Sequence, residues 1–315
     1  MIAAFVLAAA PRRADLSFHP HPSVWLVMGA VATFFWWAST RLRSRLGAPR
    51  LTGHQRAWLI AGCLSLWIFA EYPIHDVAER YLFLIHMIQH TVFTLVAPAC
   101  LLMGTPDWLQ RWILSHRPIA FATRFFTKPL VALLIFNALI AVTHWPKLVE
   151  KGLHNELIHF SIHATLFISA LCIWFPVINR QEGFTRLGAP AKMMYLFAQS
   201  IVPTVPASFL TFSNRPLYRT YEVAPRLLHG FSAISDQQIA AAIMKVGAGG
   251  YLWAIIGALF FQWWKVSQSP TASASPAPGD NRRVPKPRPV VTFAQAQAEF
   301  AATPPPAVLS EPERM

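Results

Sequence analysis

The chain has 315 residues, of which 54% are hydrophobic and only 13% are charged, and it includes 12 tryptophans. Because roughly a quarter of the residues in a soluble domain are charged, this composition excludes an ordinary soluble enzyme and excludes disorder over most of the length. Three cysteines are too few for the disulfide framework of a small secreted protein. The net charge of +13 would suggest a nucleic-acid partner in a soluble protein. Here the cations follow membrane topology, so we expect no nucleic-acid partner.

Seven stretches are long and apolar enough to cross a bilayer, which takes about 20 residues for a hydrocarbon core of about 30 Å. They lie at residues 23–40, 57–74, 82–105, 129–145, 157–178, 191–212 and 238–264. The sixth stretch carries Pro203 and Pro206, where a break in the helix is expected. The sequence therefore predicts an all-α, polytopic membrane protein with a seven-transmembrane-helix bundle.

Basic residues alternate between the loops and predict the orientation. The segments that follow the first, third, fifth and seventh stretches are rich in Arg and Lys, whereas acids balance the charges in the other loops. The loop at 213–236 is less decisive, with three arginines against two acids. An excess of cations marks cytoplasmic loops, so the prediction is an N-terminus outside and a cytoplasmic C-terminus.

Three regions are expected along the chain. Residues 1–22 form an external N-terminal segment, residues 23–264 form the seven-helix transmembrane domain, and residues 265–315 form a disordered Pro/Ala-rich cytoplasmic tail. The apolar opening of the chain resembles the core of a signal peptide but has no basic residue before it, so its cleavage is left open. Residues 292–302 are interpreted as the end of a linker, with a short partner-induced helix as the alternative.

The predicted topology gathers most of the histidines at the outer side of the membrane. At about 1.5 Å per residue, His86 and His90 lie roughly 6 and 12 Å deep, and His159 and His163 roughly 3 and 9 Å deep. Each pair is spaced i,i+4, so its two imidazoles project from one helix face and can meet at one centre. A polar side chain at membrane depth is costly without a partner, so these four residues form a candidate metal site.

Three further residues are candidate members of the same site. His144 ends the fourth stretch and can supply a fifth nitrogen, and Met244 can supply a soft sulfur. Asp236 can orient an imidazole or cap the seventh helix. Imidazoles with an optional thioether suit copper, zinc or iron better than magnesium or calcium. Four glycines of the seventh stretch are expected to admit a neighbouring helix closely: Gly247, Gly249, Gly250 and Gly257.

Three groups of motifs surround these candidates. The first is His86-Met87-Ile88-Gln89-His90, followed by Ala97-Pro98 and Gly104-Thr105-Pro106. The second is His144-Trp145-Pro146 and then His159-Phe160-Ser161-Ile162-His163, followed by Phe167 and Trp174-Phe175-Pro176. The third is Pro216-Leu217-Tyr218, Asp236-Gln237-Gln238 and Ile243-Met244. In these motifs, over roughly residues 70–265, the chain resembles the seven-helix CtaG-type cytochrome c oxidase assembly factors, a bacterial membrane family.

Two positions depart from the pattern of that family. Ile162 stands where many relatives carry an acid, which removes a carboxylate partner for His163, and Lys245 stands where they carry a tryptophan. The resemblance implies an assembly factor in the bacterial cytoplasmic (inner) membrane, with cytochrome c oxidase subunits as partners and periplasmic copper chaperones as further candidates. Together with the histidines, it implies that Cu(I) is held at the outer side of the membrane and delivered by ligand exchange. No catalysed reaction and no organic cofactor are expected.

Three alternatives stay open. Histidines on different helices also ligate haem, so a haem- or quinone-linked redox protein is one, although two histidines i,i+4 on one helix cannot take opposite axial positions. A copper transporter is another, for which Asn137 and Gln199 are polar residues near mid-membrane. The third is a scaffold that grips the oxidase without binding metal.

Overall fold

The computed structural model describes residues 17, 18, 20–268 and 297. The apolar opening of the chain and nearly all of the predicted tail lie outside the described residues, and so does the stretch 292–302, interpreted as a linker end, apart from residue 297. Two compact units divide the chain at Met1–Val266 and Ser267–Met315. Every helix described below lies in the first unit, except that the last helix ends one residue beyond it, at Ser267.

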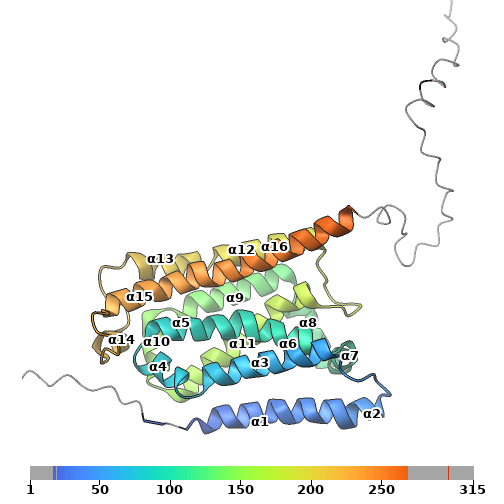
Figure 1. Cartoon of the computed structure of the whole chain (residues 1–315), viewed down its shortest axis with the longest axis horizontal. Coiled ribbons are helices and arrows are strands. Elements are labelled where there is room, and N and C mark those ends of the chain that lie inside the picture. The colour runs from blue at the N-terminus through green and yellow to red at the C-terminus, as the bar shows by residue number, and fades with distance from the viewer. Residues whose placement is uncertain (1–16, 19, 269–296, 298–315) are drawn as a thin grey trace, which may run out of the picture. The chain divides into compact units, whose positions relative to one another are not determined.

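All regular secondary structure in the described residues is helical, which confirms the predicted all-α fold class (Figure 1). The helices in chain order are α1 (Pro22–Trp37), η1 (Ala38–Leu42), α2 (Arg43–Arg45), α3 (Gly53–Ala70), α4 (Ile74–Arg80), α5 (Phe83–Thr91), η2 (Val92–Val96), α6 (Ala97–Gly104), α7 (Asp107–Leu114), α8 (Arg117–Phe126), α9 (Pro129–Thr143), α10 (Pro146–Leu153), α11 (Glu156–Ile178), α12 (Ala189–Ile201), α13 (Thr204–Phe212), α14 (Arg219–Val223), α15 (Ala233–Ala242), η3 (Ile243–Gly247) and α16 (Ala248–Ser267). The elements labelled η are π-helical turns that continue their neighbouring α-helices.

Five continuous helical runs in the described part are long and apolar enough to cross a membrane, or up to seven if each of two bent pairs is one span. The bent pairs are α3 with α4, at 47°, and α8 with α9, at 80°. Each of the seven predicted stretches falls on one of these runs or pairs. α9 has only 15 residues and reaches about 22 Å at 1.5 Å per residue, less than a bilayer core of about 30 Å. The chain is a multi-pass membrane protein.

Local sequence explains where several helices begin. Thr52 and Gln55 form a reciprocal capping box at the start of α3. Asn155 accepts a hydrogen bond from the amide of Ile158 and so caps α11. The predicted break in the sixth stretch is present, because α12 ends at Ile201 and α13 begins after Pro203.

Small residues let α3 and α6 approach closely. A Cβ atom on Gly104 would lie 2.6 Å from the backbone nitrogen of Leu59, and one on Gly62 would lie 2.9 Å from the Leu101 side chain. The expected close approach at the seventh stretch is wrong. A Cβ would meet nothing within 4 Å at three of its glycines and only the same helix at the fourth: Gly249, Gly250, Gly257 and Gly247.

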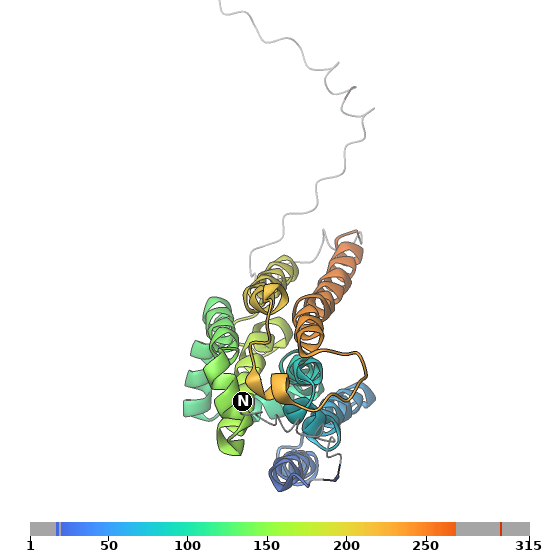
Figure 2. The same ribbon diagram turned by 90° about the vertical axis from the view of Figure 1, so that its left-hand side faces the viewer.

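The core divides into separate apolar clusters along the bundle. A central cluster joins α6, α9, α11, α12 and α16 around residues such as Phe136, Leu166 and Trp174. A second cluster, with Phe83, Tyr221 and Met244, joins the first turns of α5 to α13, α14, α15 and η3 near one end of the bundle. We call this end, at which α4, α5, α11 and α15 all start, the histidine end of the bundle. α1 lies at the margin beside α3 in both views (Figures 1 and 2), and only 11% of its apolar window is buried.

Candidate metal centre

Three imidazoles from two helices meet inside the histidine end. His86 and His90 come from consecutive turns of α5, and His163 comes from α11. One ring nitrogen of each lies within 4.8 Å of the others, as the spacing of the motifs predicted. The ring centroids of His86 and His90 are 4.5 Å apart, and those of His90 and His163 are 4.7 Å apart. We call these three residues the trihistidine cluster.

Nitrogens of this cluster are buried without a hydrogen-bond partner. His86 Nδ1, His90 Nδ1 and His163 Nε2 have none among the described residues. A buried polar atom without a partner is costly and calls for an explanation such as an ion. Two nitrogens that bind one ion at about 2.0 Å lie at most about 4 Å apart. A small closure of the rings would therefore complete a metal site.

His144 follows α9 and presents a fourth free nitrogen. Its Nδ1 lies 2.7 Å from the carbonyl oxygen of Ile140, so this nitrogen carries the hydrogen and Nε2 keeps its lone pair. Nε2 is buried and has no partner among the described residues. The Tyr218 hydroxyl donates to the carbonyl of His144 at 3.0 Å, and burial raises the pKa of Tyr218 so that the donor stays protonated.

Two small cavities border the cluster. One, of about 20 Å³, is lined by residues that include His86, His144 and His163. The other, of about 60 Å³, is lined by His90 and His144 and also by Met244. Met244 therefore shares a cavity with two of the candidate histidines.

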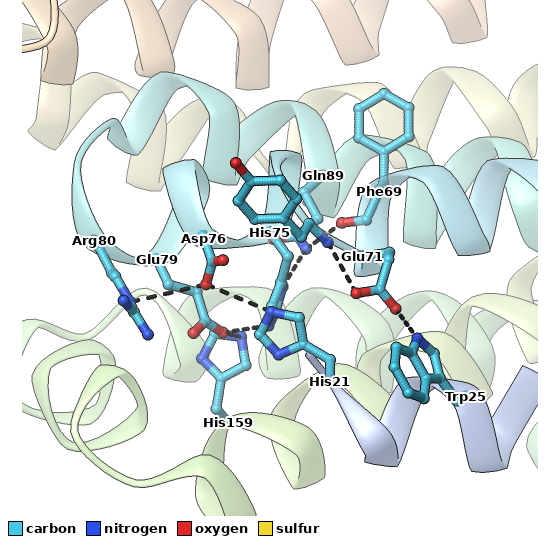
Figure 3. Close-up of polar contacts among 11 residues, drawn as sticks. His21, Trp25, Phe69, Glu71, His75, Asp76, Glu79, Arg80, Gln89 and His159 are labelled. Carbon is cyan, nitrogen blue, oxygen red and sulfur yellow. Dashed lines mark hydrogen bonds and ion pairs between the residues drawn. The ribbon is translucent and has the colours of Figure 1, made fainter. Parts of the chain in front are cut away.

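His159 is diverted from the trihistidine cluster. Its ring packs 4.4 Å from that of His163, but its Nε2 lies 2.8 Å from Oε1 of Glu79 in α4 (Figure 3). The same carboxylate oxygen lies 2.9 Å from Nε2 of His75, one turn earlier in α4. In the described structure His159 is thus held by a carboxylate beside the cluster.

Gln89 and His75 complete this polar arrangement. The Gln89 side-chain nitrogen lies 2.8 Å from Nδ1 of His75 and donates to the carbonyl of Phe69 at 2.6 Å (Figure 3). Nearer the chain start, His21 Nε2 lies 3.4 Å from Oδ1 of Asp76. Histidines and acids therefore continue from the cluster toward the N-terminal side of α1.

Asp236 is not part of the trihistidine cluster and caps the helix that carries two of its members. Its two carboxylate oxygens accept hydrogen bonds from the amides of Phe83 and Leu84, at 2.8 and 2.9 Å. These are the first amides of α5, so Asp236 fixes the start of the helix that carries His86 and His90. Ser232, whose hydroxyl accepts from the amide of Ser235, is the residue that caps α15 itself.

Glu79, His75 and Gln89 were missing from the residues selected by sequence reasoning. The i,i+4 spacing of His75 and Glu79 was the available signal, because it places both side chains on one helix face. Ile162, the residue before His163, lines the smaller cavity and supplies no carboxylate. The carboxylate beside the histidines comes from α4.

The match to known proteins covers the trihistidine cluster and the residues around it, apart from His21. The chain matches the sequence model of the family described as cytochrome c oxidase caa3 assembly factor (Caa3_CtaG) over residues 33–266. No curated protein and no solved structure matches. The matched segment makes up about three quarters of the chain and runs from α1 to α16, through the trihistidine cluster, His144 and Glu79. The chain belongs to the cytochrome c oxidase caa3 assembly factor family.

Proposed function

We propose that this protein binds Cu(I) at the trihistidine cluster and delivers it to cytochrome c oxidase during assembly. The observation that carries the proposal is the convergence of His86, His90 and His163, whose ligand atoms lie within 4.8 Å of one another. Neutral imidazoles suit copper, and their unpartnered buried nitrogens are available to it. The protein then acts as a carrier and not as an enzyme.

Further residues serve exchange of the ion in this proposal. His144 offers Nε2 to the same region, and Met244 shares the cavity of about 60 Å³ with His90 and His144. His159, held by Glu79, is the ligand nearest to the outer network of His75 and His21. Copper reaches the oxidase by replacement of one ligand at a time along these groups.

The membrane arrangement of the proposal has seven spans in the bacterial inner membrane. The N-terminus and the histidine end face the periplasm, and the C-terminus faces the cytoplasm. The excess of Arg and Lys in alternate loops supports this orientation. Copper is then received and released on the periplasmic side, where copper chaperones and oxidase subunits are the expected partners.

Two other functions find less support. The cavities at the cluster, of about 20 and 60 Å³, are far smaller than the roughly 300 Å³ or more of small-molecule sites, which argues against haem. A transporter needs a polar path through the second half of the bundle. Asn137 and Gln199 bond each other at 3.1 Å, and the central apolar cluster continues beyond them.

The proposal is tested by copper content. The full-length protein is purified in detergent, loaded with Cu(I), freed of unbound metal and measured by mass spectrometry. Wild type should retain about one copper per chain, and the variant H86A/H90A/H163A should retain none while keeping its helical circular dichroism. The matched control H54A/H116A/H154A removes three exposed histidines and should retain copper.

Equal copper retention by the cluster variant and wild type would overturn the metal site. A second measurement tests delivery. Cells that carry H86A/H90A/H163A should assemble oxidase that lacks copper. Normal copper content in that oxidase would instead show that the protein acts as a scaffold without delivering metal. A stoichiometric Soret band in the purified protein would favour the haem alternative.

A further inference from the structure

A groove separates α1 from α3 at the end of the bundle opposite the histidine end. Its volume is about 560 Å³, and its walls come from α1, η1, the start of α2 and α3. Toward the middle of the two helices the wall is apolar, with Ala32, Ile60 and Cys63. At the other end of the groove three arginines line it: Arg43, Arg50 and Arg56.

The described residues bring no acidic side chain into an ion pair with this groove. Residues 16–70 contain no Asp or Glu. Arg43 donates to the carbonyls of Ser39 and Ala48, at 2.9 and 3.5 Å, which holds its guanidinium in place. Within the described part of the chain, none of the three arginines makes an ion pair with a carboxylate. An anion is therefore the complementary ligand for this end of the groove.

The surrounding solvent determines the rest of the ligand. α1 lies at the margin of the bundle beside α3 (Figures 1 and 2), and none of its side chains is fully buried. In a membrane-spanning bundle, the side of α1 that faces away from the other helices is exposed to lipid, so we expect lipid to reach the groove. An apolar groove at membrane depth is expected to be filled by hydrocarbon, because its wall offers water no hydrogen-bond partners. A ligand with an anionic head and a long apolar chain satisfies both ends.

We propose that this groove is a binding site for an anionic phospholipid. The phosphate lies at Arg43, Arg50 and Arg56, and an acyl chain runs between α1 and α3 past Ile60 and Cys63. Basic pockets between membrane helices recognise such headgroups by charge. The lipid then adds contacts between α1 and α3, beside the packing of Phe34, Phe35 and Trp37 on the cluster that contains Trp108 and Leu109. This site is independent of copper binding.

Lipid binding to the full-length protein tests the proposal. The protein is delipidated in a neutral detergent and titrated with dioleoylphosphatidylglycerol or dioleoylphosphatidylcholine, and bound lipid is counted by native mass spectrometry. Wild type should bind phosphatidylglycerol in preference to phosphatidylcholine. The variant R43Q/R50Q/R56Q should bind phosphatidylglycerol at least about tenfold more weakly.

The matched control changes neighbouring charges outside the groove. R41Q/R45Q removes two exposed arginines of the same segment and should bind phosphatidylglycerol like wild type. Equal weakening in both variants would show a general surface effect and overturn the site, as would equal binding of the two lipids. Competition by inorganic phosphate alone, without any contribution of the acyl chain, would also contradict it.

A variant that leaves the charges unchanged covers the case in which R43Q/R50Q/R56Q does not fold. A32W places a bulky ring in the apolar part of the groove from an exposed position of α1. It should lower the affinity for phosphatidylglycerol by a similar factor. Unchanged binding in a folded A32W protein would overturn the proposed path of the acyl chain.

Discussion

Gln89 fixes the protonation pattern of His75. Its NH₂ group lies 2.8 Å from Nδ1 of His75, and the same group donates to the carbonyl of Phe69 at 2.6 Å. Because Nδ1 accepts, Nε2 of His75 carries the hydrogen and donates to Glu79. Glu79 in turn holds His159. Gln89 lies between two cluster residues in the sequence, yet it acts on α11 through α4.

We expect Gln89→Leu to destabilise the protein by about 1–3 kcal/mol, because the change leaves a part-buried ring nitrogen and a carbonyl without a donor. The fall in the detergent unfolding temperature measures this effect. Gln238→Leu is the control, since the Gln238 amide makes one exposed bond to the carbonyl of Thr211 at 3.3 Å. Equal losses in the two variants would contradict the role assigned to Gln89.

Asp236→Ala should destabilise the protein by about 1–2 kcal/mol, because it removes the acceptor of two amides at the start of α5. Copper retention should stay near one per chain, since both carboxylate oxygens serve as a cap. The measurements are thermal unfolding and bound copper, with Asp107→Ala as a control acid in the first turn of α7. Copper loss at an unchanged unfolding temperature would instead identify Asp236 as a ligand.

His144→Ala should weaken Cu(I) binding by about tenfold, in the range found when a group that supports a metal site is removed. A competition titration with a coloured Cu(I) chelator measures the affinity. His154→Ala is a close control, because His154 also follows a helix and also bonds the carbonyl four residues earlier, at 2.7 Å, but is exposed. Equal affinities of the two variants would remove His144 from the ligand set.

Gly104→Ala should cost about 1–3 kcal/mol, because its Cβ would meet the backbone of α3, which cannot move aside as a flexible side chain can. The unfolding temperature and the yield of folded protein report the effect. Gly249→Ala, where the new Cβ has open space, should be neutral or slightly stabilising. A neutral Gly104→Ala variant would refute the close packing of α3 on α6.

The sequence could predict features that depend on local spacing. The i,i+4 spacing predicted that His86 and His90 share one helix face, and matching membrane depth predicted that His163 lies beside them. Pro203 predicted the break between α12 and α13. Family motifs at the same residues led to the family that the chain belongs to. These predictions succeed because helix geometry fixes which side chains share a face.

Partners between distant helices could not be predicted in the same way. Whether His159 points to the cluster or to Glu79 depends on where α4 packs, and the 47° bend after α3 sets that position. The contact of Gly104 with α3 likewise depends on which helices become neighbours, and the glycine content of one stretch does not reveal its neighbour. Spacing along one helix carries no information about these contacts.

The bond between Asp236 and Phe83 sets an order of events during biosynthesis. Phe83 leaves the ribosome 153 residues before the carboxylate that it binds. Until the last helix has been made and inserted, the first turn of α5, three residues before His86, lacks its acceptor. A nascent chain therefore carries α5 with an uncapped first turn, and this helix reaches its full stability only when synthesis is almost complete.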